Sequence, residues 1–171
     1  MAFTTPGTAV AGEVLTAAFW NEQVRDNTNA LYSRFRILQV VSDYTAAGSG
    51  TTISTSSFTA TGLDAVITPS STSSKILVIV NQANRKSNAN SATECQSRLY
   101  RNGSAVDANL TLSTCYTGTA LELRVMASLT YLDSPATTSA VTYAMYAAAT
   151  IGTISTDYFA SGSITLMEVA A

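Results

Sequence analysis

Side chains that could catalyse a reaction or hold a metal are few and scattered in this chain. Histidine is absent, which removes the commonest metal ligand and the Ser-His-Asp and Cys-His nucleophile arrangements. The eleven carboxylates occur singly, apart from Glu22 and Asp26, whose spacing is typical of a solvated helix face. Gly48, Ser49 and Gly50 look like part of a phosphate loop, but no lysine follows them. We therefore expect no enzyme activity, no metal and no cofactor.

Two other groups are candidates for structure or for binding. The spacing of Cys95 and Cys115 matches no common metal or redox motif. It favours two small buried side chains, although neighbouring strands could bring them together in a disulfide. The stretch 81–93 is rich in Asn and Ser and predicts a polar loop, which is either simply solvated or a recognition surface. The candidate surface-recognition residues in it are Asn84, Arg85, Lys86 and Asn88.

The overall composition excludes further classes of function. Of 171 residues, 46% are hydrophobic and only 12% are charged, with a net charge of -2. This length predicts one ordinary domain and at most a short appendage. The chain has no basic stripe for phosphates and no apolar run near the roughly 20 residues of a membrane span. We expect neither a nucleic acid nor a membrane as partner, and the N-terminus does not read as a secretory signal.

The N-terminal part has its own character. Pro6, Gly7 and Gly12 break regular structure in residues 1–15, which either pack on their own domain or anchor the chain in a neighbour. Thr16 is the expected N-cap of a helix over 16–37. Steps of three and four residues define a heptad seam along this helix, with the members Ala17, Trp20, Val24, Asn27 and Leu31. A helix of this length is marginal alone, so it either lies across its own sheet or bundles with copies of itself.

From residue 38 onward the apolar pattern has a period of two. Short alternating runs are separated by turn signals, of which Asn102-Gly103 is the strongest because a two-residue hairpin turn needs positive φ at both positions. The nearly continuous apolar run 75–80 is typical of a central strand covered on both faces. We expect an antiparallel β-sandwich. A predicted surface of Thr, Ser and Ala lacks the charge that discourages association, which favours contact with neighbouring chains.

Several stretches resemble structural proteins of bacteriophage particles. A "G-x-x-L-T/S-A-A-x-W-N-x-x-V-R-D-N" stretch opens many phage fibre or decoration proteins, and residues 2–32 contain it. The matching residues are Gly12, Leu15, Thr16, Ala17, Ala18, Trp20, Asn21, Val24, Arg25, Asp26 and Asn27. Phrases within 74–78, 98–103, 131–143 and 164–168 are similar to the β-sandwich heads of such proteins. The resemblance covers most of the chain and does not distinguish tail fibres, head fibres and capsid knobs.

The resemblance implies a homotrimer with jelly-roll-like or tumour-necrosis-factor-like heads. Residues 1–37 would be an attachment segment and a short coiled-coil stem, and residues 38–171 the head. The implied function is that of a virion structural protein, a capsid decoration or short fibre assembled in the host bacterial cytoplasm. Its partners would be its own copies and a phage capsid or tail protein. The attachment residues would be Phe3, Pro6, Val10 and Val14.

The alternative function is a receptor-binding head that recognises a glycan or protein on the host surface. A third class, a depolymerase, would need two carboxylates placed in one groove, and the sequence places none. Deleting the first 35 residues separates the attachment role from the fold of the head.

Overall fold

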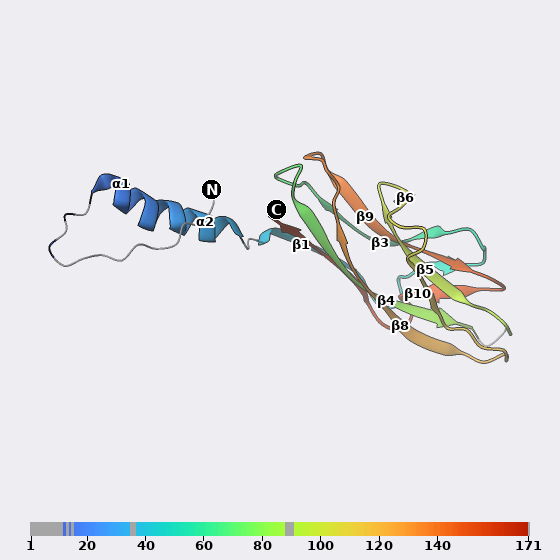
Figure 1. The fold of residues 1–171 in the computed structure, drawn as a ribbon. Helices are drawn as coiled ribbons and strands as arrows, with labels where there is room; N and C mark the ends of the chain where they lie inside the picture. Colours follow the sequence, from blue (N-terminus) through green and yellow to red (C-terminus); the bar gives the residue numbers. More distant parts are fainter. Residues whose placement is uncertain (1–11, 13, 15, 35–36, 88–90, 171) are drawn as a thin grey trace.

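The computed structural model describes residues 12, 14, 16–34, 37–87 and 91–170. Two antiparallel sheets face each other, and a short helix precedes them (Figure 1). The predicted fold class, a mainly β antiparallel sandwich with an N-terminal helix, is confirmed. The helical part ends at Arg34 and the first strand begins at Ile37.

The chain passes between the two sheets several times. In the first sheet the order is β1-β11-β4-β10-β2, and β8 pairs with the other edge of β4; in the second the order is β3-β9-β5-β6, and β7 also pairs with β5. The bounds are β1 (Ile37–Thr45), β2 (Thr52–Ile53), β3 (Thr59–Ile67), β4 (Lys75–Lys86), β5 (Cys95–Arg101), β6 (Ser104–Ala105), β7 (Thr111–Thr114), β8 (Leu123–Asp133), β9 (Val141–Ala149), β10 (Ile154–Thr156) and β11 (Gly162–Val169).

Strand β4 is the central element of the first sheet. It pairs with β8 without interruption from Ile76 to Lys86. Its other edge pairs with β11 over the first half and with β10 at the end. The sequence predicts a loop over 81–93, and this prediction is wrong as far as Lys86, where β4 ends. Its polar side chains alternate like those of any strand, but the inward ones are held by hydrogen bonds inside the sandwich.

The interior changes from apolar to polar along the sandwich. Toward the end where β1 begins, here called the stem end, aliphatic and aromatic side chains from both sheets form the main core, including Leu63, Ile76, Val78, Met145 and Leu166. Toward the end where β4 stops, here called the far end, the interior also contains amides and hydroxyls. Gln82 donates to Thr61 Oγ1 at 2.8 Å and Asn84 donates to Ser97 Oγ at 2.9 Å. Because buried polar groups need partners, these bonds fix the packing there.

One turn and one helix start follow their sequence signals. Asn102 (φ 48°) and Gly103 (φ 79°) form the predicted hairpin turn between β5 and β6. Thr16 caps the helix as predicted, because its Oγ1 accepts the Phe19 N–H at 3.1 Å. The turn and the cap are therefore confirmed.

The helix consists of three segments. They are α1 (Ala17–Trp20), the π-helical segment η1 (Asn21–Asp26) and α2 (Asn27–Arg34). In Figure 1 they extend away from the stem end of the sandwich and lie against neither sheet. The sequence left two arrangements open for this helix. In the part of the chain that the structure describes, the helix does not pack across its own sheet.

A buried carboxylate closes the stem end. Glu168 accepts hydrogen bonds at 2.7 Å from the Gln39 side chain and from both the N–H and the hydroxyl of Ser70. Burial alone raises the pKa of this carboxyl, but the hydrogen bonds outweigh it and hold the pKa at about 2. Glu168 therefore stabilises the fold above its ordinary pKa of 4.5, and this contribution is lost as the pH falls from there toward 2.

A second buried carboxylate has the opposite effect on stability. Asp157, between β10 and β11, accepts the Ala83 N–H at 3.1 Å. Burial raises its pKa to about 6, although hydrogen bonds from Ala83 and Gln82 oppose the shift. The folded protein therefore binds this proton more tightly than the unfolded chain. The contribution of Asp157 to stability is lost as the pH rises from about 4 through 6.

The first prediction concerns this pH dependence. Asp157→Asn keeps an acceptor for the Ala83 N–H and a side chain that tolerates the positive φ of 49°. It removes the buried charge, so we expect the variant to gain up to about 3 kcal/mol at pH 7 and nothing at pH 4. Urea unfolding between pH 4 and 7 measures this. Equal stability of both proteins at pH 7 would show that the buried carboxylate costs nothing.

Candidate functional site

The described residues contain no group of three or more Cys, Asp or Glu side chains arranged to hold a metal ion. Within the same ranges, no helix is both long and apolar enough to span a membrane. Two candidate surfaces lie on the outward face of the first sheet. The strand register identifies them, because it shows which side chains stand next to one another.

A row of large apolar side chains crosses the stem end of this face. The register places Val40 of β1 opposite Met167, Met167 opposite Leu77, and Leu77 opposite Leu132 of β8. Val40 is 55% exposed and Leu132 51%, while the two central members are half-buried. We call these four residues the apolar row. A contiguous apolar surface of this kind is a candidate interaction site.

The face beyond the apolar row is uncharged over most of its length. Along β4 the next residues on this side are Ile79, Asn81 and the fully buried Ala83, and along β8 they are the exposed Thr130, Ser128 and Met126. Only Thr130 and Ser128 match the expected Thr/Ser/Ala surface here. Charged side chains reappear only at the far end of these two strands, with Arg85 and Arg124, which stand opposite each other.

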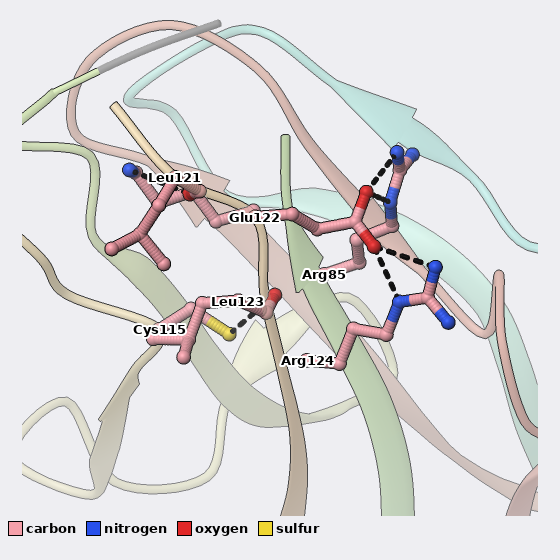
Figure 2. Close-up of polar contacts among 7 residues, drawn as sticks. Arg85, Cys115, Leu121, Glu122, Leu123 and Arg124 are labelled. Carbon is pink, nitrogen blue, oxygen red and sulfur yellow. Dashed lines mark hydrogen bonds and ion pairs between the residues drawn. The ribbon is translucent and has the colours of Figure 1, made fainter. Parts of the chain in front are cut away.

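Glu122 joins these two arginines at the far end. Arg85 donates from Nε and Nη2 to Glu122 Oε2 at 3.0 and 2.6 Å. Arg124 contacts Oε1 through Nε and Nη2, both at 2.5 Å. Figure 2 shows the two guanidiniums on either side of the single carboxylate. Hydrogen bonds from Arg85 and then Arg124 lower the pKa of Glu122, so the carboxylate stays ionised.

Aromatic rings from the β10–β11 connection complete this group. The Arg85 guanidinium carbon lies 4.3 Å from the centre of the Tyr158 ring, and that of Arg124 lies 5.7 Å from the Phe159 ring. Tyr158 is itself 51% exposed. We call Arg85, Glu122, Arg124 and Tyr158 the arginine cluster. It combines two guanidiniums with a half-exposed aromatic ring, a combination that occurs at binding surfaces.

The predicted recognition residues are only partly brought together. Arg85 points outward, but Asn84 and Lys86 are fully buried, so their predicted exposure is wrong. They lie in β4 and face the interior, where Lys86 Nζ donates to the carbonyls of Thr119 and Leu121. Asn88 lies outside the described residues. Sequence reasoning missed Arg124. The alternation of the strand 121–132 indicates which face Arg124 shares, but its place opposite Arg85 depends on the pairing of β4 with β8.

The predicted stem residues do not form one stripe. Ala17, Trp20 and Val24 are exposed, whereas Asn27 is buried. The π-helical segment η1 lies within the predicted seam, and its wider turn breaks the steps of three and four on which a heptad seam depends. Leu31 belongs to α2, but its side chain lies outside the described residues.

Only one predicted attachment residue can be placed. Val14 is exposed. Phe3, Pro6 and Val10 lie outside the described residues.

The two cysteines are free thiols in the far half of the core. Cys95 and Cys115 are buried in one cluster with Ile53 and Ile154. Burial raises the pKa of Cys95 to about 12 and also raises that of Cys115. Since the thiolate is the reactive form, we expect both side chains to react slowly in the folded protein. The prediction of two small buried residues is confirmed.

Comparisons with known proteins yield distant neighbours only. No protein-family model and no curated protein matches the chain. Solved structures that match include one of the Gx strain of infectious bursal disease virus, with a TM-score of 0.38, 9% identity and 78% of this chain covered. A mutant VP2 protein of the same virus, in derived T=1 particles, matches with a TM-score of 0.38, 11% identity and 78% coverage. The chain spans 38% and 36% of these two neighbours' own lengths.

The second prediction follows from the burial of the thiols. In the native protein we expect a thiol reagent such as dithiobis(nitrobenzoate) to label neither Cys95 nor Cys115 within minutes. After unfolding in guanidinium it should label both. The free amino acid cysteine, in the same buffer, provides the reference rate of labelling. Fewer than two thiols per chain after unfolding would mean that the cysteines are joined or modified.

Proposed function

We propose that this chain is a structural protein of a phage particle, a trimeric decoration or short fibre protein held on the particle through its N-terminal part. The apolar row carries the proposal. A face with exposed valine and leucine at its stem end and no charge across its middle is suited to contact with identical copies. The resemblance of residues 2–32 to phage structural proteins supports the proposal that the chain belongs to a phage particle. We propose no enzymatic role.

The position of the apolar row also suits a parallel arrangement. Ile37 begins β1 and is exposed beside the row, on the side from which the helix leaves the sandwich. Copies that meet through the row around a threefold axis would therefore send their helices in one direction. Exposed Trp20 and Val24 would then be available for contact between the helices.

A receptor-binding head is the second candidate function. The arginine cluster favours it, because the cluster lies at the far end, opposite the helix and its proposed attachment to the particle. The two functions are compatible, since they use opposite ends of the same face.

The third prediction tests the apolar row. Leu132→Asp places a charge in the row, which we expect to convert an assembly of three times 17.9 kDa into single folded chains. Met126→Asp is the matched control: the same charge, strand and face, but six positions away, about 20 Å along β8. It should leave the assembly intact. Light scattering after size exclusion measures the masses. An unmodified chain that runs as a monomer would refute the trimer.

The fourth prediction tests attachment. Every strand pairing of the sandwich lies within residues 37–169, so we expect a chain without residues 1–35 to keep the β-sheet signal in circular dichroism. The same chain should no longer join particles when it replaces the full-length protein during assembly. If the shortened chain is incorporated normally, attachment does not depend on the N-terminal part.

A further inference from the structure

The far end of the first sheet carries a second row of side chains, and it is polar. The register places Thr52 of β2 opposite Ser155, Ser155 opposite Arg85, and Arg85 opposite Arg124. Two hydroxyls and two guanidiniums thus stand side by side across four strands. Arg85 lies eight positions beyond Leu77 on β4, about 27 Å away at roughly 3.4 Å per residue. Contact between copies at the stem end would leave this row uncovered.

The arginines are already held in place before any ligand arrives. Glu122 contacts Nε and Nη2 of both, so each long side chain has lost much of its rotamer freedom. Within the described ranges, no hydrogen bond or ion pair uses Nη1 of Arg85 or Arg124, and the side chain of Arg124 is 52% exposed. Two positive charges and one negative charge leave the cluster with a net charge of +1. This favours an anionic ligand whose oxygens accept hydrogen bonds from guanidinium.

Tyr158, Thr52 and Ser155 indicate which other chemical groups the ligand should carry. The Arg85 guanidinium lies over one face of the Tyr158 ring, and Tyr158 is 51% exposed, so its uncovered part can contact the apolar surface of a ligand ring. Thr52 and Ser155 offer hydroxyls that both donate and accept hydrogen bonds. A pyranose ring with a carboxylate has the matching features: a C–H face, hydroxyls and one negative charge.

We propose that the arginine cluster, with Thr52 and Ser155, binds an acidic saccharide. The carboxylate would contact the outward guanidinium edge of Arg85 and Arg124, and the sugar ring would lie against Tyr158. Glu122 is a positioning residue that holds both arginines. The proposal rests on the second candidate function, recognition at the far end, and does not require the trimer.

The experiment measures binding of oligogalacturonate to the full-length protein by isothermal titration calorimetry, with the fully methyl-esterified oligomer as the neutral probe. We expect the acidic oligomer to bind and its ester to bind at least about tenfold more weakly, as expected for the loss of a charge-assisted contact. Arg124→Gln should weaken binding of the acidic oligomer about tenfold. Tyr158→Ala should weaken binding of both oligomers.

Arg98→Gln is the matched control, because Arg98 also lies over an aromatic ring, Phe58 at 4.2 Å, but in the second sheet. It should leave binding unchanged. Absence of binding, equal binding of the ester, or equal losses for the Arg124 and Arg98 variants would overturn the proposal. Equal binding of polyaspartate would also overturn it, in favour of an acidic peptide. The mass of each variant, measured in parallel, separates loss of sugar binding from loss of assembly.

Discussion

The uninterrupted pairing of β4 with its neighbours is the constraint on which the rest of the structure depends. Eleven consecutive pairs join β4 to β8, and β11 and β10 complete the other edge. A shift of one residue would exchange the two faces of the strand. Val78 and Val80 would then face outward, and Leu77 and Arg85 would face the core. The same register that builds the interior therefore also creates the apolar row and the polar row.

The two ends of the sandwich are stabilised by different means. Near the stem, aliphatic packing dominates, and Glu168 is held by Gln39 and Ser70. At the far end, amides and hydroxyls share the interior with two thiols, and buried Asp157 costs stability at neutral pH. An apolar end suits association between copies. A more polar far end, with loops on either side, suits recognition, because binding residues commonly lie on loops supported by a rigid scaffold.

The sequence predicts the fold better than it predicts the sites. Thr16 and Asn102-Gly103 act through local chemistry, so their roles could be predicted without knowing the fold. The end of β4 could not be predicted in this way. The side chains of Gln82, Asn84 and Lys86 can face the interior because they find hydrogen-bond partners far away in the chain. The arginine cluster could not be predicted either, because its members come from separate parts of the chain. Arg85 and Glu122 alone are more than thirty positions apart. The π-helical segment that interrupts the seam likewise has no signal in the heptad pattern.

The central claim is that the apolar row lies between identical copies while the far end stays open. A map of the assembled particle by electron cryomicroscopy, at a resolution that shows side chains, tests it most directly. The account predicts Leu77 and Leu132 in contact with neighbouring copies around a threefold axis, the helices together on the particle side, and Arg124 facing away from the particle. A map in which the apolar row faces solvent, or in which the far end is the attached end, would contradict it.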